Sequence, residues 1–413
     1  MNILIANWTW FPSGGDWTYI ESICKLYELH GHKTIPFSVH NEKNFHTPYE
    51  NLFLNSPDYK KYYKGMSINT LFNVLVKSVY SVEAKKKLLF LLENINIDIA
   101  QLININNYHT PSIIPVLRSK KIPIVWRILD YKLICPNTTF LQHEKVCEEC
   151  FKHKYYNCIV HKCKKNSLLA STLMAFESYF YYLLPIYNQV DLFLFQSEFT
   201  RDLFVKYGYK LSKTHIIENP YNCSSDQPKY EGENYILYFG RISKEKGILT
   251  LLKAMKLLPD IELKVVGDGP EFESYTTFVI ENSISNVSFL GPKWKAELEP
   301  IIKDCEFVVV PSEWYEPSGY VVLQSFSYGK PVIAAGIGGL KDIVVNNKNG
   351  LLFESGNVDS LTKSIRSLFW DKKLIKKLGM SAREVLETKY NPERYYNDTI
   401  NVFTDLINSK IRS

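Results

Sequence analysis

One stretch of sequence decides how this chain folds: Pro311-Ser-Glu-Trp-Tyr-Glu-Pro-Ser-Gly-Tyr-Val-Val-Leu-Gln-Ser-Phe-Ser-Tyr-Gly-Lys-Pro-Val-Ile-Ala334. It follows the apolar run Phe307–Val310, which predicts a buried strand, and it ends in a second predicted strand, Pro331–Ala334. Between them the pattern predicts a helix near Val321–Tyr328. Strand–loop–helix–strand units of this kind are typical of parallel sheets covered by helices.

The loop after the first of these strands carries the polar groups. Glu316 is expected at the carboxyl end of the strand, and Ser318 and Gly319 open the helix. The free backbone N–H groups and the dipole of a helix start suit an anion such as a diphosphate. Ser and Gly also occur there for capping alone, so the spacing leaves both interpretations open. Gln324 lies further along the helix among apolar residues, where a polar group needs a partner.

The same alternation continues in both directions and predicts two α/β domains. Residues 1–217 form the first and residues 234–390 the second, joined by the polar, two-proline linker 218–233, and residues 391–413 form a helix that packs back on the first domain. A ligand site is then expected in the cleft between the domains. The other strands are expected at Ile3–Ala6, Lys33–Ser38, Ile99–Ile103, Ile122–Ile128, Leu192–Gln196, Ile236–Phe239, Glu262–Val266 and Val287–Phe289.

The composition is that of a globular protein. Of the 413 residues, 46% are hydrophobic and 22% charged, which excludes a disordered chain. The 49 basic and 43 acidic residues leave a net charge of only +6, spread over many segments, so a nucleic-acid partner is not expected. Eight cysteines are too few for a disulfide scaffold of this length.

Three glycine-rich loops are further candidates for a ligand site. Tyr238-Phe-Gly-Arg-Ile-Ser-Lys-Glu-Lys-Gly247 offers Gly240 for close backbone approach and Arg241 and Lys246 for a phosphate pair, although a solvated basic loop fits equally. The stretch Val265-Val-Gly-Asp-Gly-Pro270, which contains Asp268, is predicted as a strand that ends in a glycine-rich turn. On its own this motif is weak evidence for a ligand site. Ser13-Gly-Gly-Asp16 either lets a ligand approach or forms a tight turn.

Together these segments resemble the retaining glycosyltransferases of family 4, over nearly the whole chain. The resemblance rests on Gly14-Gly15, on Arg241 with Lys246, on Gly267-Asp-Gly-Pro270, and on Glu316-Pro-Ser-Gly followed by a helix and Gly329-Lys-Pro-Val-Ile. It implies the GT-B architecture, in which two Rossmann-like domains face each other across a cleft. Asp130-Tyr-Lys-Leu-Ile-Cys-Pro-Asn137, with the cysteines after it, is similar to a recurring variant of the family.

The resemblance also implies a role for each matching residue. Arg241 and Lys246 would neutralise the donor pyrophosphate and the charge on the departing nucleotide diphosphate, and Glu316 would hold hydroxyls of the donor sugar. No metal or other cofactor is required for this chemistry. The donor-binding set is Gly14, Gly15, Gly240, Asp268, Ser318, Gly319, Tyr320, Val321 and Gln324.

Two positions depart from the family pattern. Position 324 is Gln where the family has a second Glu that binds the ribose, and an amide makes the weaker, uncharged hydrogen bond. Leu129 stands where the family often has a His near the reaction centre, and Leu can neither donate nor accept. Both departures bear on turnover rather than on fold.

Five cysteines cluster in the sequence around residues 135–163 as an insertion in the first domain. Cys147 and Cys150 form one close pair of the kind found in zinc sites, and the others are Cys135, Cys158 and Cys163. A structural zinc, free thiols and disulfides all remain open, because a second Cys-x-x-Cys is missing and three histidines make the ligand set ambiguous: His143, His153 and His161.

The sequence predicts a cytoplasmic protein. Clusters of basic and apolar residues in the first half would place it at the inner face of the cell membrane. The start, Met1-Asn-Ile-Leu-Ile, has no basic export region, and the apolar stretch Leu168–Phe195 is interrupted by polar residues and Pro185. The clusters Lys60–Lys64, Lys85–Leu92 and Lys162–Lys165 suit a peripheral membrane contact or, alternatively, solvated helix faces.

The favoured hypothesis is therefore a retaining hexosyltransferase that uses a nucleotide-diphosphate sugar and a glycan or lipid-linked acceptor, in cell-surface polysaccharide synthesis. The alternatives are a sugar-nucleotide-binding scaffold with little turnover, which Leu129 and Gln324 would fit, and a nonhydrolysing sugar-nucleotide epimerase.

Overall fold

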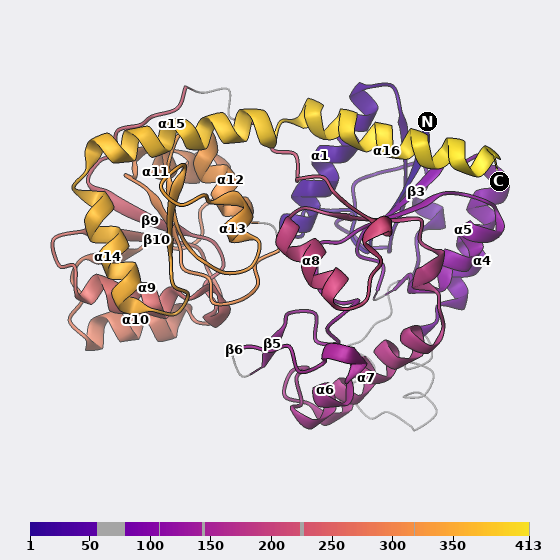
Figure 1. Cartoon of the computed structure of the whole chain (residues 1–413), viewed down its shortest axis with the longest axis horizontal. Helices are drawn as coiled ribbons and strands as arrows, with labels where there is room; N and C mark the ends of the chain where they lie inside the picture. Colours follow the sequence, from indigo (N-terminus) through magenta and orange to yellow (C-terminus); the bar gives the residue numbers. More distant parts are fainter. Residues whose placement is uncertain (56–78, 107, 143–144, 224–226, 318, 413) are drawn as a thin grey trace.

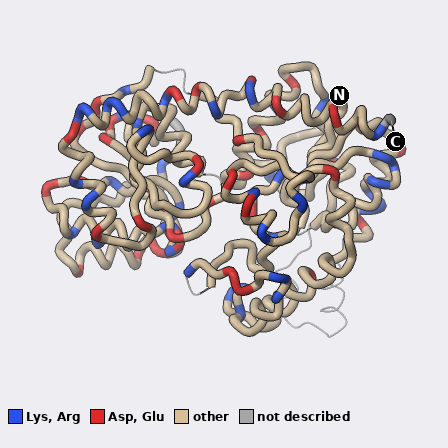
Figure 2. The backbone as a smooth tube through the Cα atoms, viewed as in Figure 1, with Lys and Arg blue, Asp and Glu red and all other residues tan. Residues whose placement is uncertain are grey.

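The computed structural model describes residues 1–55, 79–106, 108–142, 145–223, 227–317 and 319–412. It has two α/β domains side by side, each built on a six-stranded sheet (Figure 1). The basic segment 60–64 and Ser318 lie outside the described residues. Figure 2 shows basic and acidic residues interspersed over both domains.

The first domain has a parallel sheet in the order β2-β1-β3-β4-β7-β8. Its strands are largely apolar because helices cover both faces. The strands are β1 (Asn2–Ala6), β2 (Lys33–Phe37), β3 (Ile99–Leu102), β4 (Ile124–Arg127), β7 (Leu192–Phe195) and β8 (Thr214–Ile216). The helices are α1 (Gly15–Leu29), α4 (Val82–Asn94), α5 (Ile114–Ser119) and α8 (Glu198–Lys206), with short 3-10 turns η1 (Glu50–Leu52), η2 (Pro111–Ile113), η4 (Tyr187–Gln189) and η5 (Leu211–Lys213).

The second domain has a parallel sheet in the order β11-β10-β9-β12-β13-β14, the strand order of a Rossmann fold. The strands are β9 (Tyr235–Phe239), β10 (Glu262–Val266), β11 (Val287–Phe289), β12 (Val308–Val310), β13 (Val332–Ala335) and β14 (Gly350–Phe353). The helices are α9 (Ile248–Lys256), α10 (Phe272–Glu281), α11 (Leu298–Asp304), α12 (Tyr320–Ser327), α13 (Leu340–Ile343), α14 (Val358–Phe369) and α15 (Lys372–Lys389), with 3-10 turns η6 (Lys244–Lys246) and η7 (Lys295–Glu297).

The chain returns to the first domain at its end. Helix α15 leads into α16 (Pro392–Arg412), which runs along α1 (Figure 1). The hydroxyls of Tyr19 and Tyr395 are 2.6 Å apart, and Lys410 lies 2.9 Å from Asp191. Helix α16 therefore ties the second domain to the far side of the first.

An insertion between β4 and β7 projects from the first domain beside the second (Figure 1). It consists of the hairpin β5 (Leu141–Gln142) and β6 (Lys145–Val146), the turn η3 (Phe151–His153), and helices α6 (Tyr156–Val160) and α7 (Leu168–Leu183). The charged residue of α7, Glu177, is buried and lies 2.8 Å from Lys132. Among the described residues, no helix combines the length and the hydropathy that crossing a membrane demands.

Candidate functional site

The candidate site lies where the strand order of the second sheet reverses. Strands β9 and β12 are neighbours in the sheet, yet the chain leaves them in opposite directions, to β10 and to β13. Such a reversal opens a crevice at the carboxyl ends of the strands, which is where ligands bind in open α/β sheets. The loop with Arg241 and Lys246 follows β9, and the loop with Glu316 follows β12.

Glu316 is held by three donors on one carboxylate oxygen. The Lys246 ammonium lies 2.7 Å from Oε2, the Trp314 indole N–H donates to it at 3.0 Å, and the Ser312 hydroxyl donates at 3.3 Å. Within the described ranges, the other oxygen, Oε1, accepts no hydrogen bond. The carboxylate is thus fixed in orientation and keeps one oxygen for a ligand hydroxyl.

Lys246 is held in place by its own turn, η6. Gly247 has a left-handed φ of 69°, and a Cβ there would lie 1.9 Å from the Pro311 carbonyl oxygen. The Glu313 N–H donates to the Glu245 carbonyl at 2.9 Å, which joins the two loops a second time. Only glycine allows this close approach.

Arg241 extends from the same loop but is exposed to solvent. The Tyr238 hydroxyl donates to its carbonyl oxygen at 2.7 Å, so the backbone is fixed while the guanidinium forms no salt bridge to any described residue. A fixed backbone and an uncommitted guanidinium suit a residue that receives an anion.

The glycines of the Gly267-Asp-Gly-Pro270 turn let two loops pack together. A Cβ at Gly267 would lie 1.9 Å from the Gly240 carbonyl oxygen, and one at Gly269 would lie 2.2 Å from that of Ile242. The exposed Asp268 carboxylate accepts a hydrogen bond from Gly269 N–H at 2.7 Å, within its own turn. This turn supports the backbone of the Arg241 loop.

Helix α12 begins beside Glu316. Its N-cap, Gly319, is left-handed with a φ of 50°, and the first two helical residues are Tyr320 and Val321. Gln324 is half-buried one turn later, and its side-chain amide forms no hydrogen bond within the part of the chain that the structure describes. The helix start and this amide therefore remain open to a ligand from the same side.

The first domain faces this helix with its glycine loop. A Cβ at Gly15 would lie 3.9 Å from the Tyr320 ring, which brings the loop after β1 against α12, and Gly14 has a φ of 129°. Leu129 is half-buried and packs into the apolar cluster beneath α1. The two segments from opposite halves of the sequence thus form facing walls.

Two acidic residues near this loop were not among the predicted site residues. The Asn104 side-chain amide donates to the Asp16 carboxylate at 2.5 Å. Burial raises the pKa of Asp16 to about 6, and the negative charge of Asp130 raises it further. The hydrogen bond from Asn104 opposes both effects. Burial also raises the pKa of Asp130. Their positions after the glycine pair and after β4 are visible in sequence, but their proximity is not.

Two further glycines, also unpredicted, support Glu316 from behind. The Gly339 N–H donates to the Glu316 carbonyl at 3.0 Å, and a Cβ at Gly338 would lie 2.7 Å from the Glu316 nitrogen. The available signal was a glycine cluster, Gly336-Ile-Gly-Gly339, after the strand that ends at Ala335.

Direct contacts join the two sides of the cleft. The Gln196 amide donates to the Pro317 carbonyl at 2.8 Å, and the Tyr315 hydroxyl donates to Glu148 of the insertion at 2.8 Å. The rings of Phe199 and Tyr315 meet at 4.9 Å between centroids. The loop that carries Glu316 is therefore anchored to the first domain on both sides.

The cysteines of the insertion are free thiols. Cys150, Cys158 and Cys163 lie around a small apolar core with Tyr155 and Ala175, whereas Cys135 packs in the main core of the first domain. Cys158 and Cys163 are hydrogen-bonded, and burial raises the pKa of Cys150 to about 12. No three His, Cys, Asp or Glu side chains within the described ranges are grouped closely enough to hold a metal ion. A structural zinc stays a prediction.

Two facing Rossmann-like domains with the crevice between them define the GT-B architecture. The structure of sucrose-phosphate synthase from Thermosynechococcus elongatus superimposes with a TM-score of 0.70 at 18% identity, over 99% of this chain and 100% of that one. This likeness establishes the fold.

Sequence comparison is more specific for the second domain. Residues 223–385 match the family described as Glycosyl transferases group 1. The uncharacterized glycosyltransferase MJ1178 of Methanocaldococcus jannaschii is 34% identical over 177 residues, 43% of this chain and 50% of the relative. The lipopolysaccharide core biosynthesis glycosyltransferase LpsE of Rhizobium meliloti is 27% identical over 159 residues, 38% and 46% of the two chains. The chain thus covers half or less of these relatives.

Proposed function

We propose that the protein is a glycosyltransferase that moves a hexosyl group from a nucleotide-diphosphate sugar to a hydroxyl of a glycan or lipid-linked acceptor. The observation that carries the proposal is the Lys246–Glu316 pair, 2.7 Å apart at the strand reversal of a Rossmann-like sheet. Arg241 and Lys246 bind the pyrophosphate, and Glu316 holds a hydroxyl of the donor sugar through Oε1. The match of residues 223–385 to Glycosyl transferases group 1 supports the assignment.

The proposed chemistry follows from these charges. As the bond between the sugar and the diphosphate breaks, negative charge builds on the leaving diphosphate, and fixed cations stabilise it most where water is excluded. The anomeric configuration is retained, as the resemblance to family 4 implies. A role in cell-surface polysaccharide synthesis agrees with the name of LpsE, the lipopolysaccharide core biosynthesis glycosyltransferase of Rhizobium meliloti.

The test is a thermal-shift panel of UDP, GDP and their sugars, followed by mass spectrometry of products formed with a mixed glycan acceptor pool. A ligand at 100 times its Kd stabilises the native state by about 2.7 kcal/mol. Stabilisation by one nucleotide together with a glycosylated product supports the proposal. Stabilisation without product favours the scaffold. If no nucleotide stabilises the protein and no product forms, the protein has no nucleotide-sugar site.

We also propose that the protein works at the inner face of the cell membrane and contacts it through α7. The outer face of this helix is apolar, with Leu168, Phe176 and Leu183 exposed at 56%, 58% and 74%. Lys162–Lys165 precede the helix and add attraction to anionic lipids.

Sedimentation with phosphatidylglycerol–phosphatidylcholine vesicles tests this contact. Phe176→Ser with Leu183→Ser should release the protein from the vesicles. Ile280→Ser is the matched control, because Ile280 is 72% exposed but lies on α10 of the other domain. The membrane contact would be rejected if the wild type, the double variant and Ile280→Ser sedimented equally with the vesicles, or if the wild type did not sediment with them at all.

A further inference from the structure

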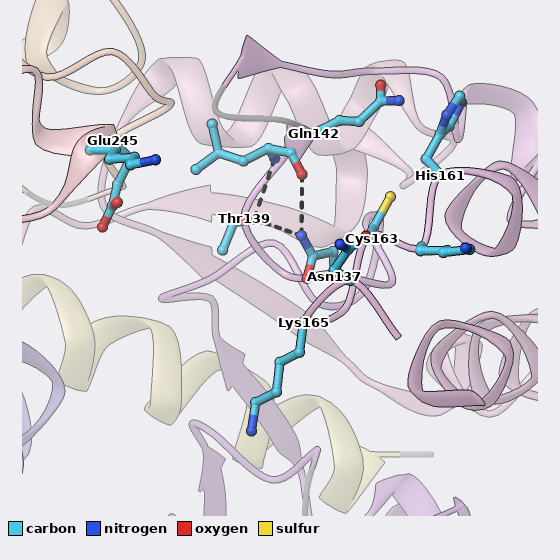
Figure 3. Close-up of a pocket in the computed structure, with 11 residues that line it drawn as sticks. Asn137, Thr139, Gln142, His161, Cys163, Lys165 and Glu245 are labelled. Carbon is cyan, nitrogen blue, oxygen red and sulfur yellow. Dashed lines mark hydrogen bonds between the residues drawn. The ribbon is translucent and has the colours of Figure 1, made fainter. Parts of the chain in front are cut away.

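A cavity of about 430 Å³ lies between the insertion and the second domain (Figure 3). The insertion supplies Asn137, Gln142, Lys162 and Lys165 to its lining, and the second domain supplies Lys244 and Glu245. In Figure 3, Asn137 and Gln142 lie between Glu245 on one side and His161 on the other. The volume falls in the range of small-molecule sites, roughly 300–1,000 Å³.

The charged residues of the lining are mostly basic. Three lysines and one glutamate contribute to it, and Ser243 donates to that glutamate, Glu245, at 2.6 Å within its own loop. Lys162 and Lys165 form no ion pair with any residue in the described ranges. Uncommitted ammonium groups around a cavity attract an anion, because each supplies charge-assisted hydrogen bonds.

The turn that carries the two insertion lysines has an unusual backbone conformation. Lys162 and Lys165 both have left-handed backbones, with φ of 48° and 52°. Neighbouring Lys164 has its pKa lowered, first by burial and then by the positive charges of Lys132 and Lys165. The charges of Lys164 and Lys165 therefore lie close enough to repel each other, whereas Lys132 is paired with Glu177 at 2.8 Å.

The cavity shares a wall with the proposed reaction centre. Lys244 and Glu245 are the two residues before Lys246, which holds Glu316. The donor groups of the site, Arg241 and the start of α12, belong to the second domain, whereas most of the cavity belongs to the insertion of the first. A ligand in the cavity would therefore approach the donor sugar from the acceptor side.

We propose that this cavity binds an anionic group of the acceptor, a carboxylate or a phosphate, through Lys162 and Lys165. Asn137 is oriented for the same ligand, because its amide donates to Thr139 and to the Leu141 carbonyl, each at 3.2 Å, which leaves its oxygen as an acceptor for a sugar hydroxyl. The acceptor is thus an acidic saccharide. This inference rests on the proposed function and specifies its acceptor.

The test measures binding of three probes to the full chain saturated with the nucleotide that binds best: methyl glucuronide, methyl glucoside 6-phosphate and neutral methyl glucoside. The variants are Lys162→Gln with Lys165→Gln, and Lys154→Gln as control, since Lys154 is an exposed lysine of the insertion outside the cavity lining. We expect at least one acidic probe to bind at least tenfold more tightly than the neutral one. Comparing methyl glucuronide with methyl glucoside 6-phosphate shows whether the cavity prefers a carboxylate or a phosphate.

The double variant should lose this preference and keep the wild-type affinity for the nucleotide, whereas Lys154→Gln should keep both. Equal affinity for all three probes, no binding of any probe, or a preference that survives in the double variant would overturn the acidic-acceptor site. Absence of nucleotide binding in the wild type would instead reject the proposed function. If the double variant fails to fold, Lys165→Gln alone must reduce the preference, or the inference is wrong.

Discussion

The ammonium of Lys246 lies 2.7 Å from Oε2 of Glu316, although 70 positions separate the two residues in the chain. Parallel strands β9 and β12 are neighbours in the sheet, so the loops at their carboxyl ends meet. Gly247 against Pro311, and Glu245 against Glu313, keep those loops in contact. The pair therefore depends on the strand order and on these two contacts between the loops.

Arg241→Ala and Lys246→Ala should each weaken binding of the nucleoside diphosphate. Hydrogen bonds to charged groups contribute about 1.5–3 kcal/mol, which corresponds to roughly a 10- to 150-fold rise in Kd. Isothermal titration with UDP and GDP measures it. Lys253→Ala on α9 is the control, because Lys253 is exposed and outside the site. Unchanged affinity in both site variants would refute the pyrophosphate assignment.

Gly247→Ala should damage the site by moving η6. The new Cβ would lie 1.9 Å from the Pro311 oxygen at a left-handed φ, so the turn must shift and Lys246 must leave Glu316. We expect a loss of about 2–4 kcal/mol in the free energy of unfolding, with weaker nucleotide binding. Gly31→Ala is the matched control: its φ is 75° but no atom lies within 4 Å, so only about 1 kcal/mol should be lost. Similar losses in the two variants would show that the contact with Pro311 is unimportant.

Gln324 distinguishes an enzyme from a scaffold. If its half-buried amide binds the ribose, Gln324→Glu should preserve or improve donor binding and turnover, and Gln324→Ala should cost about 1–3 kcal/mol of binding. If the site has lost its catalytic role, the new carboxylate lacks a partner on α12 and should lower the melting temperature without restoring activity. Melting temperature and product formation are measured on the same samples.

The pH dependence of stability should report on Asp16. Its pKa rises from 3.8 to about 6 in the folded protein, so the native state binds more protons than the unfolded state between these values, and stability falls as pH rises through this window. His109 acts oppositely: burial lowers its pKa from 6.5 to about 4, so its contribution is lost as pH falls. The raised pKa of Asp130 adds to the Asp16 effect.

Asp16→Asn removes the contribution of Asp16 to the pH dependence, whereas His109 and Asp130 contribute in both the variant and the wild type. The stability difference between variant and wild type should therefore grow in favour of the variant from pH 4 to pH 6, by about 2–3 kcal/mol. Urea unfolding at half-unit steps of pH measures it. A difference independent of pH would mean that the Asp16 carboxylate is not destabilised by burial.

The sequence predicts about one structural zinc per chain in the insertion, although no three candidate ligands of the described ranges are grouped in the structure. Elemental analysis of protein purified without chelators measures the stoichiometry. Cys147→Ser with Cys150→Ser should abolish it, and Cys223→Ser, outside the insertion, should not. No stoichiometric zinc in the wild type would leave the free thiols of the structure as the answer.

Much of the fold could be predicted from sequence because strands buried on both faces are short apolar runs. The expected strands Ile3–Ala6 and Ile236–Phe239 lie within the buried strands β1 and β9, and the helix expected near Val321–Tyr328 is α12. Ser197 caps α8 by accepting from the Thr200 N–H at 3.2 Å. Such features depend on local periodicity and capping, which sequence records directly.

The sequence by itself determined two parallel α/β domains and the loops that bear Arg241, Lys246 and Glu316, because apolar period and glycine placement are local properties. Tertiary structure alone decided the pairing of Lys246 with Glu316, the approach of Asp16 to Asp130, and the cavity beside η6. These contacts join segments tens to hundreds of residues apart. Their distances depend on strand order and domain packing, which no local pattern encodes.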